Sequence, residues 1–250
     1  MKTEKILVVA NWKANPESKK EAEKLAKGLS KNWKSRDSKN KDYVICPPAI
    51  FLDVVAKNLP RGAALGVQDL YFDKSGAHTA MITPPMAKSI GANYSIVGHS
   101  EMRASIDTHE SINKKVNFII SSSMTPILCI GENDRDENGF YLKEVSDQIT
   151  SALYGISKKS LSSLIIAYEP VWAIGSGAKR EATPKECQEM VIFIRKIIRD
   201  LYDADSSKKV KIIYGGSVNE ENSASYIEDG MAEGFLVGRV SLDPKRFLSL

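Results

Sequence analysis

The sequence predicts an α/β protein: one closed (β/α)8 barrel, in which eight parallel strands are each followed by a helix, as a single domain over residues 1–250. Three observations favour this fold. Short apolar runs alternate with longer amphipathic segments along the whole chain. The runs lack any alternation of apolar and polar residues, which is typical of strands buried on both faces of a parallel sheet. The length of 250 residues is usual for such a barrel.

Eight runs are expected to be strands because each is short and rich in Val, Ile and Leu. They cover residues 6–10, 43–46, 63–67, 94–97, 127–130, 164–168, 210–214 and 235–237. Their starts lie roughly thirty residues apart, which indicates a repeated βα unit.

Helices are expected between the strands, where apolar residues recur with helical spacing. The clearest segments are 19–30, 110–121, 141–153 and 184–202. The last begins with Thr183 as N-cap and Pro184 in the first turn. An open doubly wound sheet is the alternative, but it would favour a glycine-rich phosphate loop after the first strand, where the chain reads Asn11-Trp12-Lys13.

Composition indicates an ordinary globular chain, with 42% hydrophobic and 26% charged residues. This excludes a disordered chain, a coiled coil, a collagen-like repeat and a disulfide scaffold. The 35 Lys and Arg against 31 Asp and Glu give a mild net charge of +4. The densest basic run, residues 20–31, has glutamates interleaved with its lysines, so it is interpreted as a solvated helix face and no nucleic-acid partner is expected.

A cytoplasmic location without a membrane segment is expected. The three cysteines, Cys46, Cys129 and Cys187, stand far apart, which fits reduced thiols. The first apolar run is too short for the core of a signal peptide, and no later run is long enough to span a membrane.

The residues that follow the strands are the candidates for function, because active sites of (β/α)8 barrels lie at the carboxyl ends of the strands. These residues are Asn11-Trp12-Lys13, Gln68, Gly98-His99-Ser100-Glu101, Gly131-Glu132, Glu169-Pro170, Gly215-Gly216-Ser217 and Gly238. One rim therefore carries a lysine, a histidine, several carboxylates and two glycine-bearing turns.

The charged residues of this rim suggest acid–base chemistry, although each also has a structural interpretation. Glu169 could pair with a neighbouring cation, and His99 could be a hydrogen-bonded structural residue. Lys13 is costly to bury unless a carboxylate or a ligand anion pairs with it, and Glu101 is a candidate partner. Together, a carboxylate base, a neutral donor and a cation suit proton abstraction next to a carbonyl group.

The glycine-bearing turns suggest a phosphate site. Barrels often bind phosphate through backbone N–H groups in the loops after strands seven and eight, where Gly215-Gly216-Ser217 and Gly238 lie. The small residues 173–178 follow Glu169 and suit either a mobile lid or a plain surface loop.

These motifs together resemble the triosephosphate isomerase family over essentially the full chain. The similar segments are Asn11-Trp12-Lys13, Gly98-His99-Ser100-Glu101, the stretch from Ala167 to Gly175, Tyr214-Gly215-Gly216-Ser217-Val218 and Phe235-Leu236-Val237-Gly238. The resemblance implies a TIM barrel that interconverts dihydroxyacetone phosphate and glyceraldehyde 3-phosphate through an enediolate, in glycolysis and gluconeogenesis. It implies a triose phosphate substrate, no cofactor and no metal.

The resemblance also implies a role for each site residue. Glu169 would be the base, His99 the neutral electrophile, and Lys13 with Asn11 the electrostatic stabilisers, with Glu101 holding Lys13. The remaining roles are phosphate binding by Gly175, Ser217, Gly238 and the neighbouring Arg239, a hydrophobic cover from Ile174 and Leu236, and a lid latch from Tyr214. It further implies a homodimer in which the loop around Thr79 reaches the neighbouring subunit.

Three features depart from the family's usual sequence. The segment between Gly177 and Pro184 is longer, and Arg239 replaces a glycine. Met81 and Met102 replace a glutamate and an arginine that the family commonly pairs, and we expect an apolar contact in a retained dimer. Two alternative functions remain at this point: a Schiff-base aldolase with Lys13 as nucleophile, and a catalytically silent barrel that binds phosphorylated ligands or anionic polymers.

Overall fold

The structure is a computed structural model that describes residues 5–34, 37–175, 178 and 180–250. Eight parallel strands close into a barrel in chain order, and β8 pairs back onto β1. The strands are β1 (Ile6–Asn11), β2 (Lys41–Cys46), β3 (Ala63–Val67), β4 (Ala92–Val97), β5 (Thr125–Ile130), β6 (Ile165–Tyr168), β7 (Lys211–Tyr214) and β8 (Gly234–Val237). The predicted (β/α)8 fold class is confirmed.

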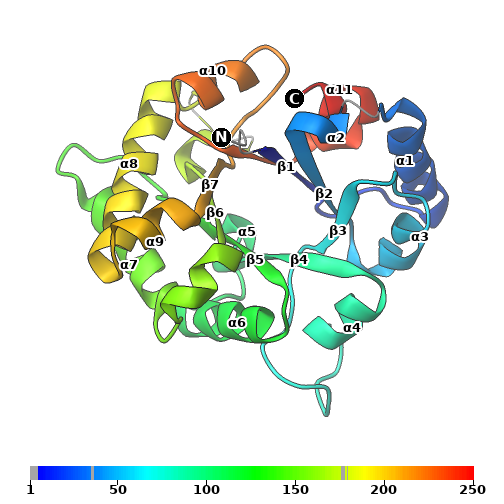
Figure 1. The fold of residues 1–250 in the computed structure, drawn as a ribbon, viewed down its shortest axis with the longest axis horizontal. Helices are drawn as coiled ribbons and strands as arrows, with labels where there is room; N and C mark the ends of the chain where they lie inside the picture. The colour runs from blue at the N-terminus through cyan, green and yellow to red at the C-terminus, as the bar shows by residue number, and fades with distance from the viewer. Residues whose placement is uncertain (1–4, 35–36, 176–177, 179) are drawn as a thin grey trace.

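Helices surround the ring of strands (Figure 1). They are α1 (Lys19–Asn32), α2 (Asp37–Asn40), α3 (Leu52–Ala56), α4 (Pro84–Ser89), α5 (Ser100–Arg103), α6 (His109–Ser121), α7 (Phe140–Leu153), α8 (Pro184–Leu201), α9 (Ala204–Lys209), α10 (Ser223–Glu228) and α11 (Pro244–Ser249). Short 3-10 turns are η1 (Ala49–Phe51), η2 (Lys158–Ser163), η3 (Val171–Ala173) and η4 (Arg239–Leu242). The last helix, α11, packs beside α1, so the end of the chain closes the ring (Figure 1).

Each strand buries both faces in separate cores. Alternate side chains fill the barrel interior, and the intervening ones pack outward against the helices. The interior cluster contains Leu7, Val9, Val44, Cys46, Ile96, Ile127, Cys129, Ile165, Ala167, Ile213 and Leu236. Two-sided burial explains why the strands are continuous apolar runs in the sequence.

The start of α8 has the predicted cap. Thr183 Oγ1 accepts a hydrogen bond from the Glu186 N–H at 3.2 Å, and the Glu186 carboxylate accepts one from the Thr183 N–H at 2.7 Å. This reciprocal pair is a capping box. The helix ends at Leu201, one residue before the predicted end, because Tyr202 leaves the helical conformation with φ −130° and ψ −84°.

All three cysteines are free and buried. Cys46 and Cys129 lie inside the barrel, whereas Cys187 packs in the outer core. Burial raises the pKa of the Cys187 thiol to about 12 and also raises the pKa values of the other two thiols. Within the described residues, none of the helices is both long enough and apolar enough to span a membrane.

Candidate active site

The carboxyl ends of the strands bring the predicted charged residues to one rim of the barrel. Asn11 is the last residue of β1 rather than the first residue after it, and it continues the inward-facing series of Leu7 and Val9. Glu169 comes directly after β6 and continues the inward-facing series of Ile165 and Ala167 in the same way. The period of two residues along a strand therefore directs both side chains toward the barrel axis.

Lys13 is held in an uncommon backbone conformation, with φ +53°. Its N–H donates to Asn11 Oδ1 at 3.0 Å, and its carbonyl accepts from Gln68 Nε2 at 2.9 Å. The same Gln68 nitrogen donates to the Cys46 carbonyl at 3.1 Å, which ties the Lys13 backbone to β2. These contacts stabilise a conformation that costs about 1–3 kcal/mol and direct the lysine along the rim.

The ammonium group of Lys13 lies 2.6 Å from Glu101 Oε1. Partial burial acts to raise the pKa of Glu101, but the hydrogen bond and the charge of Lys13 outweigh it and lower that pKa. The Glu101 carboxylate is therefore ionised at neutral pH and fixes the position of the lysine charge.

The ring of His99 is oriented by the short helix that follows it. The Glu101 N–H in the first turn of α5 donates to His99 Nδ1 at 3.3 Å. Because Nδ1 accepts this hydrogen bond, the proton of the neutral ring is on Nε2. Nε2 lies 3.2 Å from Glu169 Oε1, and the histidine residue is only 8% exposed. His99 is thus a neutral donor that faces the carboxylate.

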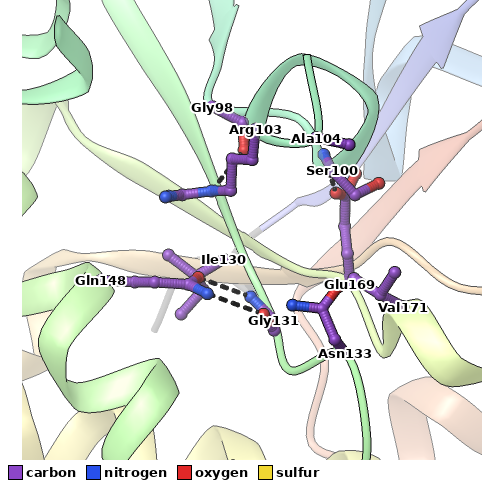
Figure 2. Close-up of a pocket in the computed structure, with 10 residues that line it drawn as sticks. All are labelled: Gly98, Ser100, Arg103, Ala104, Ile130, Gly131, Asn133, Gln148, Glu169 and Val171. Carbon is purple, nitrogen blue, oxygen red and sulfur yellow. Dashed lines mark hydrogen bonds between the residues drawn. The ribbon is translucent and has the colours of Figure 1, made fainter. Parts of the chain in front are cut away.

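Glu169 is 2% exposed, and its Oε2 accepts a hydrogen bond from the Ser100 N–H at 3.0 Å (Figure 2). Its inward-facing neighbours across the sheet are glycines, Gly131 after β5 and Gly215 after β7. A Cβ at Gly215 would lie 2.9 Å from Glu169 Cγ, and one at Gly131 would lie 1.7 Å from the Glu169 carbonyl oxygen. The two glycines therefore leave the space that the carboxylate and its backbone occupy.

A buried carboxylate, a neutral imidazole donor and a fixed ammonium group meet at this rim. Such a set can move a proton between adjacent carbons of a carbonyl compound while donors stabilise the oxyanion that develops. A family model described as triosephosphate isomerase matches residues 6–250. The chain belongs to the triosephosphate isomerase family. A curated triosephosphate isomerase of Dictyoglomus thermophilum is 38% identical over 253 residues, which cover 98% of this chain and 97% of that protein.

The residues that match the family's phosphate loops lie at the same end of the barrel. Ser217 follows β7, and Gly238 follows β8. A Cβ at Gly238 would lie 3.6 Å from Lys13 Cε, so this loop passes beside the lysine side chain. Arg239, which replaces a family glycine, begins η4 and is exposed. It is not among the residues with positive φ, so the arginine fits without left-handed strain.

The resemblance predicts that the segment after Glu169 is a lid. Ile174 is half-buried, and Gly175 is exposed with φ +79°, whereas Ser176, Gly177 and Lys179 lie outside the described residues. Leu236 is buried inside the barrel.

Tyr214 is connected to the far end of the lid through a second tyrosine. Its ring stacks on Tyr226 with centroids 4.1 Å apart, and its hydroxyl donates to the Tyr226 hydroxyl at 3.4 Å. The Tyr226 hydroxyl in turn donates to the Ala182 carbonyl, next to the α8 cap.

Sequence reasoning missed a set of contacts around Trp172, at the start of the lid. Trp172 Nε1 donates to Glu132 Oε1 at 2.8 Å, and the Tyr168 hydroxyl donates to the same oxygen at 2.8 Å. Burial raises the pKa of Glu132, although both hydrogen bonds oppose the shift. Arg180 lies over the Trp172 ring at 4.6 Å and forms a bidentate ion pair with Glu186 at 2.6 and 2.9 Å.

These contacts involve the segment between Gly177 and Pro184. Arg180 lies within that segment, and it joins Trp172 at the start of the lid to Glu186 in the cap of α8. Cation–π and bidentate ion-pair contacts are both favoured by the planar guanidinium group. The only sequence signal was the expected extra length between Gly177 and Pro184, which gives no indication of what these residues contact.

Two further polar residues, Gln68 and Arg103, support the rim without an assigned role in the sequence. Gln68 was placed at the rim by its position after β3, but its contact with Lys13 depends on the closed barrel. Arg103 Nε donates to the Gly98 carbonyl at 2.8 Å (Figure 2). Its Nη2 donates to the Cys129 carbonyl at 2.9 Å. Arg103 thereby ties the end of β4 to β5.

Proposed function

We propose that this protein interconverts dihydroxyacetone phosphate and glyceraldehyde 3-phosphate, as the triosephosphate isomerase family does, in glycolysis and gluconeogenesis. The observation that carries the catalytic assignment is the contact between His99 Nε2 and the Glu169 carboxylate at 3.2 Å. It pairs a buried carboxylate with an imidazole whose other nitrogen already accepts a backbone hydrogen bond. A proton acceptor and a neutral proton donor therefore face the same space.

In the proposed mechanism, Glu169 removes a proton from the carbon next to the substrate carbonyl. The electrons of that C–H bond form the carbon–carbon double bond of an enediolate, and the carbonyl oxygen gains negative charge. His99 Nε2–H and the Lys13 ammonium stabilise that charge, and Asn11 orients the Lys13 backbone. The proton of the adjacent hydroxyl group passes through His99 to the former carbonyl oxygen, and Glu169 returns its proton to the former carbonyl carbon. The electrons of the double bond form the new C–H bond and the adjacent carbon becomes the carbonyl, so no external oxidant or reductant is consumed.

The proposed phosphate site consists of backbone N–H groups of Gly175, Ser217 and Gly238, with Arg239 beside them. Support comes from the position of the last three residues after β7 and β8, where barrels commonly bind phosphate. The exposed Arg239 adds a positive charge to this edge. Ile174 and Leu236 would cover the substrate and exclude water, and Tyr214 would support the closed lid through Tyr226.

The proposed biological unit is a cytoplasmic homodimer of single-domain subunits. Thr79 is exposed on the loop that we assign to the subunit interface, and Met81 next to it is 48% exposed. An exposed methionine side chain is suited to an apolar contact with a second copy. Thr79 would then reach the active site of the partner subunit.

A Schiff-base aldolase is less compatible with the geometry around Lys13. Its Nζ is held 2.6 Å from the Glu101 carboxylate, whereas a Schiff-base nucleophile must leave such a contact to attack a carbonyl carbon. Borohydride reduction in the presence of substrate separates the two reactions, because only the aldolase would leave substrate attached to Lys13.

The first test is a coupled assay of glyceraldehyde 3-phosphate conversion with the wild-type protein, Glu169→Asp and Lys13→Ala. Lys57→Ala is the matched control, since Lys57 is also paired with a carboxylate but lies outside the site, at the end of α3, with its side chain 70% exposed. We expect rapid turnover that falls by on the order of 10²–10³-fold in both site variants and is unchanged in the control. A folded wild-type protein that binds inorganic phosphate without turnover would instead indicate a silent binding barrel.

A further inference from the structure

The buried side chain of Gln148 forms two hydrogen bonds with one residue at the end of β5. Gln148 lies on α7 and is 6% exposed. Its Oε1 accepts from the Gly131 N–H at 2.9 Å, and its Nε2 donates to the Gly131 carbonyl at 2.8 Å (Figure 2). The amide thus pairs with Gly131 as a neighbouring strand would, one residue beyond the end of β5 at Ile130.

Gly131 is in direct contact with the backbone of Glu169. A Cβ at Gly131 would lie 1.7 Å from the Glu169 carbonyl oxygen, so only the bare glycine permits this approach. On one side of Gly131, the Glu169 N–H donates to the Ile130 carbonyl at 2.7 Å. On the other side, the Val171 N–H donates to the Glu132 carbonyl at 3.1 Å. The three successive residues of segment 130–132 therefore contact the backbone of residues 169–171 on both sides of the Glu169 carbonyl.

The Glu169 carboxylate depends on this backbone support because one side of it is not closely packed. A cavity of about 120 Å³ lies beside it, lined by Ser100, Arg103, Asn133, Gln148 and Glu169 among others (Figure 2). A side chain that borders a cavity is oriented by its backbone and hydrogen bonds rather than by close contacts on every side. A shift of segment 130–132 would therefore move the carboxylate.

We propose that Gln148 is a positioning residue for the proton-transfer reaction, and that it acts on Glu169 through Gly131. The inference rests on the proposed role of Glu169 as the base. Both polar atoms of the Gln148 amide are engaged by Gly131, so it supplies no charge or proton to the substrate. Its role is to hold Gly131, and thus Glu169, in the geometry that proton transfer needs.

Replacement by an apolar side chain of similar length removes both hydrogen bonds. In Gln148→Met the Gly131 N–H and carbonyl lose their partners inside the protein, and the freed segment shifts to satisfy them. Because a misplacement of about 1 Å can cost about 100-fold in rate, we expect kcat to fall by about 10- to 100-fold. The phosphate loops lie after β7 and β8, so KM and inhibition by inorganic phosphate should change by less than about threefold.

Gln148→Glu provides a readout that a merely structural role would not give. The ionised carboxylate can accept from the Gly131 N–H but repels the Gly131 carbonyl, whereas the protonated acid can donate to it. A carboxyl group buried at this position should bind its proton more readily than an exposed one. We therefore expect the kcat of this variant, relative to the wild type, to recover as the pH falls from 8 to 6.

The experiment measures kcat, KM and phosphate inhibition between pH 6 and pH 8 for the wild type, Gln148→Met, Gln148→Glu and Glu169→Asp. Ile149→Val is the matched control, because Ile149 is the next buried residue on α7 and packs only in the apolar core. We expect it to lower the melting temperature while kcat stays within about twofold of the wild type.

The outcomes separate the two proposals. Full kcat in a folded Gln148→Met, with Glu169→Asp impaired, would overturn the role of Gln148 and leave the base assignment standing. Full activity in Glu169→Asp would overturn the base assignment itself. If Gln148→Met does not fold, the pH dependence of kcat in Gln148→Glu tests the role of Gln148 instead. A pH profile of kcat parallel to that of the wild type would contradict the inference.

Discussion

Glu169 Oε1 lies 3.2 Å from Nε2 of His99, so the two side chains that we assign to proton transfer are in direct polar contact. The second carboxylate oxygen accepts the Ser100 N–H. A substrate that enters between the two side chains must replace this contact with its own carbonyl oxygen and C–H group. The two side chains therefore contact each other directly until a substrate separates them.

Glu101→Gln should weaken catalysis moderately. The change removes the carboxylate charge that lies 2.6 Å from Lys13 Nζ but leaves the backbone N–H that orients His99. A partly exposed ion pair contributes about 0.5–1 kcal/mol, which corresponds to a two- to fivefold fall in kcat/KM. Steady-state kinetics at several pH values checks this prediction.

The same variant gives a pH signature. Because the pKa of Glu101 is lowered in the folded protein, the ion pair between Glu101 and Lys13 persists at pH values above the ordinary carboxyl pKa and somewhat below it. The difference in kcat/KM between the variant and the wild type should thus stay constant from neutral pH down to pH 5 and shrink only in stronger acid. A difference that disappears near pH 6 would contradict the assigned ion pair.

Gly215→Ala should impair catalysis more than stability. The new methyl group would lie 2.9 Å from Glu169 Cγ, so the carboxylate must move. We expect kcat to fall by about 10- to 100-fold with little change in KM. Gly28→Ala is the control, because its methyl group would be similarly crowded, 2.8 Å from Pro244 Cγ, at a position remote from the rim. Equal kcat losses in the two variants would argue against a local effect on Glu169.

Glu186→Gln should destabilise the protein at neutral pH by about 1 kcal/mol, the usual contribution of a helix cap. The ion pair with Arg180 is the main cause that lowers the pKa of Glu186 from an ordinary 4.5 to about 2. A depressed folded-state pKa contributes stability that is complete above about pH 4.5 and is lost as the pH falls toward 2.

Urea denaturation at pH 7 and at pH 3 tests this pH dependence. The difference in the free energy of unfolding between the wild type and Glu186→Gln should be smaller at pH 3 than at pH 7. The control Glu17→Gln, at an exposed residue, should have almost the same free energy of unfolding as the wild type at either pH. A difference in the free energy of unfolding that grows in acid would mean that the carboxylate does not stabilise the folded state in its ionised form.

Met102→Arg should weaken the proposed homodimer. The substitution places a positive charge opposite Met81, which offers no carboxylate to pair with it. We expect the dissociation constant to rise at least tenfold, by about 1.4 kcal/mol or more, and the double variant Met81→Glu with Met102→Arg to recover most of the affinity. Sedimentation velocity over a dilution series measures both constants.

The control for the dimer prediction is Ile192→Arg, on the exposed side of α8, where the side chain is 54% exposed. It should leave association unchanged. A wild-type protein that sediments as an active monomer would contradict the homodimer itself.

Much of the fold could be predicted because two-sided burial leaves a strong apolar signal in each strand. The predicted strands missed mainly the polar first residues, such as Lys41 and Asp42 of β2. These residues pair with Ile6 and Leu7 through backbone groups, which place no demand on side-chain polarity. Strand starts are therefore less visible in a sequence than strand cores.

The location of the candidate rim could be predicted for the same reason, since the end of each apolar run marks the start of a loop on the active face. The contacts that support the rim could not be predicted from the sequence. Gln148 reaches Gly131 from 17 residues away along the chain, and Gln68 reaches Lys13 across 55 residues. Neither residue type nor spacing indicates such partners, because they are set by the distance between elements in the closed barrel.

The burial of every cysteine has a consequence for chemical resistance. Alkylating agents and peroxides attack the thiolate form, and a thiol with a pKa of about 12, as at Cys187, is almost entirely protonated in the neutral range. The other two thiols are also shielded by the barrel wall. Inactivation by such reagents should therefore proceed no faster than the protein unfolds. The rate of thiol labelling then measures the rate at which the native state opens.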